Sequence, residues 1–82
     1  MKIVGFDRFC TLLAQEFDVD ASTLSRDTHV VDELAFDSLE LLRLSIFIEM
    51  LAPIDMPTDV DFKALTLGAV YDHYAVNAAT ID

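Results

Sequence analysis

The chain has little of what would make it a disulfide-stabilised, metal-binding or nucleic-acid-binding protein. Its 82 residues include one cysteine, two histidines, two glycines and two prolines, and only five Lys or Arg stand against 15 Asp or Glu. Cys10 alone cannot form an internal disulfide, and no Cys/His spacing resembles a metal site. The formal net charge of −10 disfavours nucleic acid and anionic membrane surfaces as partners and favours basic protein surfaces.

Long apolar runs and leader-like segments are also missing. The longest stretch without a charged residue, 73–81, is far shorter than the roughly 18 residues that a membrane span needs. The first 17 residues are interrupted by Asp7, Arg8 and Glu16 and do not resemble a signal peptide. These absences predict a cytoplasmic, soluble monomer that does not act at a membrane.

What the sequence has instead is helical periodicity. A spacing of three or four predicts a first helix over about 6–17, with an apolar stripe made of Phe6, Phe9, Cys10, Leu13 and Phe17. Residues 19–36 are rich in Ser, Thr and Asp and predict a long loop with a short helical turn around 21–24. Asp37 and Glu40 match a capping box, with Phe36 and Leu41 as a hydrophobic staple. The second helix therefore begins at 38, and Pro53 ends it at about 51 or 52.

Two further helices follow. Residues 58–65 fit a short third helix with Thr58 as its cap, and Thr66 caps a fourth helix that reaches about Tyr74. The tail from Ala75 is weakly patterned and is expected to fray. The predicted fold is all-α, a small four-helix bundle with three longer helices, one short third helix and a long loop between helices 1 and 2. We expect a single domain over 1–82 with an ordered core over about 5–75.

The predicted second helix carries an excess of apolar residues, nine of the thirteen from 39 to 51. They form two opposite stripes: Leu41, Leu44, Ile48 and Leu51 on one side, and Leu39, Leu42, Ile46 and Met50 on the other. A chain this small cannot surround a helix, so we expect the second stripe, flanked by Arg43 and Glu49, to be exposed and used for recognition. Alternatively, both stripes are internal and the 19–36 loop covers the second.

Ser38 occupies the first turn of this helix. The helix dipole and the free backbone N–H groups favour a negative group there, such as a phosphate. A serine near a helix start is also common for capping reasons alone. The position by itself therefore leaves both interpretations open.

Residues 34–42 read Leu-Ala-Phe-Asp-Ser-Leu-Glu-Leu-Leu and resemble the phosphopantetheine attachment motif of acyl and peptidyl carrier proteins. The family's Asp-Ser-Leu is Asp37-Ser38-Leu39. The resemblance continues at Asp55-Met56-Pro57 and at 62–67, where the family leads into its last helix. Size, acidity and the order of the elements agree as well, so the resemblance covers about 6–74.

The resemblance implies that Ser38 receives a 4′-phosphopantetheine group from coenzyme A, with Asp37 and Leu39 beside it. A separate Mg²⁺-dependent phosphopantetheinyl transferase would install the group, and its thiol would hold an acyl or aminoacyl group as a thioester. The chain would be a phosphoprotein carrier and not an enzyme, with no catalytic or metal-binding residues of its own. Its other partners would be an acyl- or aminoacyl-loading enzyme and a downstream acyltransferase, ketosynthase or condensation enzyme. The expected partner-binding residues are Leu39, Glu40, Leu42, Arg43, Ile46, Glu49 and Met50.

Two departures from the family pattern narrow the expectation. The second helix of fatty-acid carriers is strongly acidic, whereas this one has only Glu40 and Glu49, offset by Arg43. Phe36 replaces a residue that is often small. These features favour a discrete carrier of polyketide or nonribosomal peptide biosynthesis. The alternatives are a non-enzymatic helical interaction module that uses the exposed stripe, and a small hydrolase or transferase that uses Ser38 and lacks an evident base.

Overall fold

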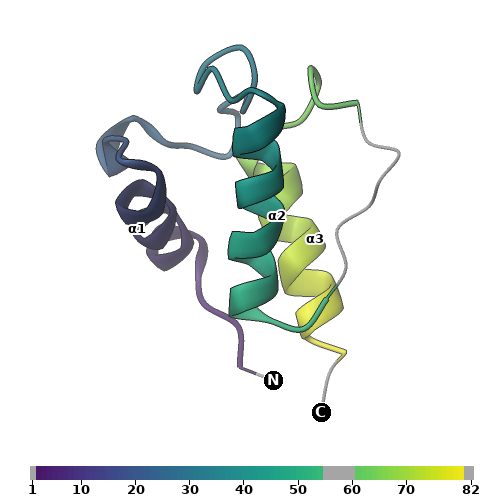
Figure 1. Cartoon of the computed structure of the whole chain (residues 1–82). Coiled ribbons are helices and arrows are strands. Elements are labelled where there is room, and N and C mark those ends of the chain that lie inside the picture. Colours follow the sequence, from purple (N-terminus) through teal and green to yellow (C-terminus); the bar gives the residue numbers. More distant parts are fainter. Residues whose placement is uncertain (1, 55–60, 81–82) are drawn as a thin grey trace.

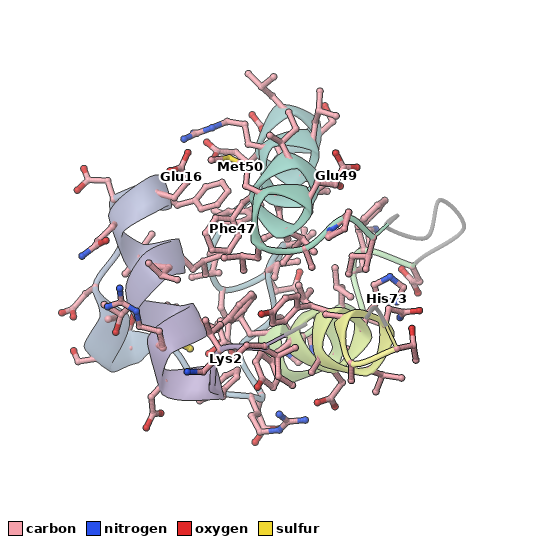
Figure 2. The ribbon with its side chains drawn as sticks, turned by 90° about the horizontal axis from the view of Figure 1, so that it is seen from below. Lys2, Glu16, Phe47, Glu49, Met50 and His73 are labelled. Atoms are coloured by element: carbon pink, nitrogen blue, oxygen red, sulfur yellow. The ribbon has the colours of Figure 1, made fainter. Side chains whose placement is uncertain are left out.

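The computed structural model describes residues 2–54 and 61–80, which contain three α-helices and one turn of 3₁₀-helix (Figure 1). α1 spans Phe6–Phe17, the 3₁₀-helix η1 spans Ala21–Thr23, α2 spans Ser38–Leu51 and α3 spans Leu67–Ala78. α2 and α3 lie side by side and run in the same general direction (Figure 1). Seen from below, α1, α2 and α3 lie on three sides of a shared core (Figure 2). For the residues described, the predicted all-α fold with a long loop before the second helix is confirmed.

The start and end of α2 follow from its local sequence. Asp37 is the N-cap, and its carboxylate accepts a hydrogen bond from the Glu40 N–H at 2.9 Å. The helix ends at Leu51, two residues before Pro53, whose ring and missing N–H are incompatible with a continuing helix. Both boundaries were predicted from the cap and the proline.

Aromatic rings fill the space between the helices. Phe9 of α1 lies 5.7 Å from Phe47 of α2 and 6.2 Å from Tyr74 of α3, measured between ring centroids. Aliphatic side chains surround these rings, among them Leu13, Val30, Leu44, Ile48, Leu67 and Val70. Each fully buried side chain of this size contributes about 1.5–3 kcal/mol through removal of apolar surface from water.

The long loop between α1 and α2 is held against the start of α3. The Leu67 N–H donates to the Thr28 carbonyl at 2.9 Å, and the Val30 N–H donates to the Leu65 carbonyl at 3.1 Å. Val30 is fully buried. The loop therefore passes over the end of the bundle where α2 begins (Figure 1), and it is fixed there before the chain enters α2.

Two sequence expectations need correction. The tail from Ala75 does not fray: α3 continues to Ala78, whose side chain is fully buried, so tertiary packing stabilises a turn that its own sequence only weakly favours. In the described part of the predicted short third helix, Phe62–Ala64 form a turn and not a helix. Its expected cap, Thr58, lies outside the described residues, so the fourth helix of the bundle stays a prediction.

Candidate functional site

Ser38 is exposed at the N-terminus of α2. The Asp37 carboxylate accepts a hydrogen bond from the Glu40 N–H, and the Asp37 carbonyl accepts one from the Leu41 N–H, both at 2.9 Å. Within the described residues, the N–H groups of Ser38 and Leu39 bond to no protein acceptor, as is usual in the first turn of a helix. An exposed hydroxyl beside free donors and the positive end of a helix dipole is suited to carry a phosphate ester.

The sequence indicated neither of two features of the segment leading into Ser38: a left-handed residue and the ring against which Phe36 packs. Ala35 adopts a left-handed conformation with φ 58°. Phe36 is buried, and its ring stacks on that of Phe17 with centroids 4.8 Å apart. The chain thus reaches Ser38 through a strained residue followed by an anchored one.

The outer side of α2 presents a row of exposed apolar side chains. We call them the outer stripe: Leu39 (65% exposed), Leu42 (58%), Ile46 (48%) and Met50 (78%). On the opposite side of the helix, Leu44 and Ile48 are buried. The predicted division of α2 is confirmed, and the alternative in which the 19–36 loop covers the outer stripe is wrong. An apolar row of this length beside Ser38 is a candidate contact surface.

Arg43, expected at the edge of the outer stripe, is engaged within the protein. Its guanidinium lies 4.8 Å from the centroid of the Phe17 ring and donates to the Glu16 carbonyl at 3.1 Å. It also pairs with the Glu40 carboxylate at 3.4 Å. Arg43 therefore joins α2 to the C-terminal end of α1, where a cation is favoured by the helix dipole.

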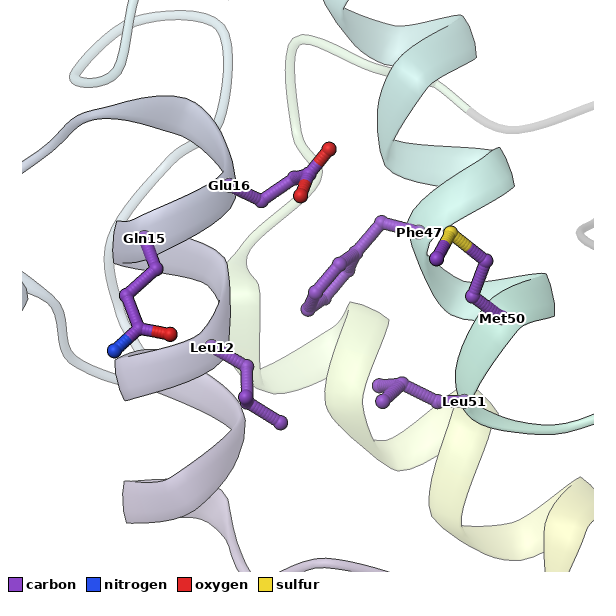
Figure 3. Close-up of a pocket in the computed structure, with 6 residues that line it drawn as sticks. All are labelled: Leu12, Gln15, Glu16, Phe47, Met50 and Leu51. Carbon is purple, nitrogen blue, oxygen red and sulfur yellow. The ribbon is translucent and has the colours of Figure 1, made fainter.

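A cavity of about 300 Å³ lies between α1 and α2 (Figure 3). Its lining comes from both helices: Leu12, Gln15, Glu16, Phe47, Met50 and Leu51. The α2 members begin nine residues after Ser38, about 14 Å along the helix axis. Met50 belongs to both the cavity and the outer stripe, so the two apolar surfaces are continuous. The sequence pattern did not reveal this cavity because its walls come from two helices.

The remaining chemistry-bearing groups form no further site in the part of the chain that is described. No group of three or more His, Cys, Asp or Glu side chains is placed there to hold a metal ion. Cys10 is buried, and burial together with the charge of Asp7 raises the pKa of its thiol, which makes it a poor nucleophile at neutral pH. None of the described helices is long and apolar enough to cross a membrane.

Comparison with known proteins yields consistent relatives. No family model matches the chain. It is 33% identical to an acyl carrier protein of Picosynechococcus sp. over 63 residues, 77% of this chain and 78% of that protein. It is 25% identical to an acyl carrier protein of Clostridium acetobutylicum over 68 residues, 83% and 88% of the two chains. It is also 28% identical to the acyl carrier protein AcpXL of Brucella melitensis over 54 residues, 66% and 58% of the two chains. With this identity spread over most of its length, and with an all-helical structure, the chain belongs to the acyl carrier protein family.

Proposed function

We propose that this chain carries acyl or aminoacyl intermediates as thioesters on a 4′-phosphopantetheine group attached to Ser38. The observation that carries the proposal is the exposed Ser38 within Asp37-Ser38-Leu39 at the free end of α2, in a member of the acyl carrier protein family. The thiol chemistry would belong to the prosthetic group, while the protein supplies position and recognition.

Attachment would join the Ser38 Oγ to the phosphorus on the phosphopantetheine side of the pyrophosphate in coenzyme A. The Ser38 O–H bond and the bridging P–O bond break, adenosine 3′,5′-bisphosphate leaves, and the serine proton passes to a base of the transferase. On this chain, Asp37 holds the first turn through the Glu40 N–H. The N–H groups of Ser38 and Leu39 would stabilise the charge of the new phosphodiester.

The outer stripe is the proposed partner-binding surface, with Glu40, Arg43 and Glu49 at its edges. Exposed apolar rows rimmed by charges are typical of protein contact sites. The proposed partners are a phosphopantetheinyl transferase, an acyl- or aminoacyl-loading enzyme and a downstream acyltransferase, ketosynthase or condensation enzyme.

The pathway we favour is polyketide or nonribosomal peptide biosynthesis, served by a monomeric, cytoplasmic carrier. Residues 37–51 hold three acids and one base, a net charge of −2, so charge alone offers partners little on α2. The outer stripe offers a larger apolar area. Partner choice would then depend on apolar fit, as suits a specialised set of enzymes.

Intact-mass analysis tests the proposal directly. The chain is incubated with coenzyme A, Mg²⁺ and a promiscuous phosphopantetheinyl transferase, and one added phosphopantetheine is expected. Ser38→Ala should abolish the addition, whereas Ser45→Ala, a matched change on α2 whose hydroxyl bonds the Leu41 carbonyl, should retain it. An unmodified chain under conditions that convert a known carrier would instead favour the alternative, a helical interaction module.

A further inference from the structure

The segment that enters α2 is strained at one residue and anchored at the next. We propose that Phe36 is a positioning residue, which holds Ser38 where a transferase can modify it by keeping this segment in its strained conformation. The inference rests on the proposed modification of Ser38 and adds a residue that determines its efficiency.

The strain lies at Ala35. Its φ of 58° is in the left-handed region, where the Cβ of an alanine crowds its own backbone and a glycine would not. Ala35 is exposed, so its side chain gains little packing energy in return. A residue keeps such a conformation only where its neighbours determine it.

The backbone on both sides of Ala35 is fixed. Before it, the N–H groups of Glu33 and Leu34 donate to the His29 carbonyl at 3.0 and 3.2 Å. After it, the Phe36 N–H donates to the Val30 carbonyl at 3.0 Å. Because Val30 is fully buried, this second bond ties the segment to the core.

The Phe36 ring adds a further anchor. It is buried against Phe17, with ring centroids 4.8 Å apart and ring planes 30° apart. The Arg43 guanidinium also lies 4.8 Å from the Phe17 ring centroid. Phe17 thus contacts one side chain that precedes Ser38 and one that follows it, so these contacts connect the segment before α2 with both α1 and α2.

Loss of the Phe36 anchor should let Ala35 relax out of the left-handed region. Ser38 is only three residues further along the chain. Asp37, which accepts the cap hydrogen bond from the Glu40 N–H, lies between Ala35 and Ser38. Relaxation would therefore shift the Ser38 hydroxyl and loosen the cap. Small displacements of a reacting group are costly in rate.

Transferase kinetics with coenzyme A and Mg²⁺ test the proposal. Phe36→Leu keeps an apolar side chain and removes the stack, and kcat/KM for modification should fall about tenfold. The variant Ala35→Gly alone should retain the original rate. Combined with Phe36→Leu it should restore the rate to within about twofold, because a glycine adopts the left-handed conformation without the steric strain that would drive Ala35 out of it.

Phe9→Leu is the matched control, since Phe9 is a buried core ring whose stacking partners among the described residues include neither Phe36 nor Phe17. It should lower the unfolding midpoint and leave kcat/KM unchanged. Phe17→Leu removes the same stack from the other ring and should slow modification as Phe36→Leu does. It therefore tests the stack even if Phe36→Leu folds poorly.

Hydrogen exchange of the Glu40 amide gives a readout that needs no modification at Ser38. Exchange should be faster in Phe36→Leu and return towards the original rate in the double variant with Ala35→Gly. The positioning role is overturned if Phe36→Leu and Phe17→Leu are both modified as fast as the unchanged protein. It is also overturned if the double variant is as slow as Phe36→Leu. If Ser38 is never modified, the exchange data still decide whether the anchor acts on the cap.

Discussion

Ile46 and Ile48 are two residues apart on α2 and point to opposite sides of it. The Ile46 side chain is 48% exposed on the outer stripe, whereas Ile48 is fully buried between the helices. Two residues of the same type thus serve different purposes, one in stability and the other in the proposed recognition.

Truncation of each isoleucine should separate these roles. Ile48→Ala is expected to lose about 2–4 kcal/mol of unfolding free energy, because it removes buried methyl groups and leaves a cavity. Ile46→Ala should lose less than about 1 kcal/mol. Urea denaturation followed by circular dichroism measures both, and equal losses would show that the outer stripe is part of the core.

A charge on the outer stripe should affect binding and leave the fold intact. Leu42→Glu is expected to raise KM for a partner enzyme about tenfold, since a carboxylate would have to be desolvated at an apolar contact, with kcat little changed. Val76→Glu is the control, because Val76 is 66% exposed on α3. A Leu42→Glu chain that binds as before would remove the outer stripe from the recognition surface.

Residue-level contacts differ in how far sequence predicts them. Exposure of Leu42 follows from helical periodicity and the small size of the chain. The contacts of Arg43 with Phe17 and Glu16 do not, because both partners come from α1 and meet Arg43 only through tertiary packing. The left-handed conformation of Ala35 could not be predicted either, since alanine, unlike glycine, does not indicate that conformation.

At the level of elements, the junction between the long loop and α3 is unusually close. The Gly68 N–H donates to the Arg26 carbonyl at 2.9 Å. A Cβ on Gly68 would lie 2.9 Å from the same carbonyl oxygen and 3.1 Å from the Arg26 Cβ. The absence of a side chain therefore lets the loop lie against the first turn of α3.

Gly68→Ala should destabilise the protein although alanine is the better helix former. The overlap involves backbone, which cannot easily move, and we expect a cost of about 1–3 kcal/mol. Gly5→Ala is the matched control, because a Cβ at that residue would have no neighbouring atom within 4 Å, and it should change stability by less than about 1 kcal/mol. Thermal unfolding of both variants decides, and a stabilised Gly68→Ala would contradict the close approach.

Element boundaries were predictable where a local signal existed. α2 begins at its Asp37 cap and ends before Pro53, as its sequence indicates. The end of α3 was missed, because residues after Tyr74 carry no stop signal and the burial of Ala78 depends on packing. The short segment before α3 was predicted as a helix capped by Thr58, and its described part is a turn.

At the scale of the whole molecule, acidity and apolar exposure are separated. Residues 37–51 account for −2 of the net charge of −10, which leaves −8 on the rest of the chain. Some acids are paired, as Asp72 is with Arg26 at 2.6 Å. Fifteen acids against five bases leave a large excess of negative charge, so mutual repulsion opposes the compact state.

Salt should therefore stabilise this protein. The molecule measures 35 × 28 × 19 Å, and the Debye length falls from about 30 Å at 0.01 M salt to about 3 Å at 1 M. At low salt every acid acts on every other, whereas at high salt only close pairs interact. We expect the unfolding free energy, measured in urea, to rise by about 1 kcal/mol over this range, the sum of several weak repulsions between exposed charges.

Two variants separate overall repulsion from local pairing. Asp32→Asn should stabilise by a few tenths of a kcal/mol at low salt only, while Asp72→Asn should destabilise because it breaks the pair with Arg26. A free energy independent of salt, or the same sign for both variants, would show that local contacts and not overall repulsion govern the charge dependence of this fold.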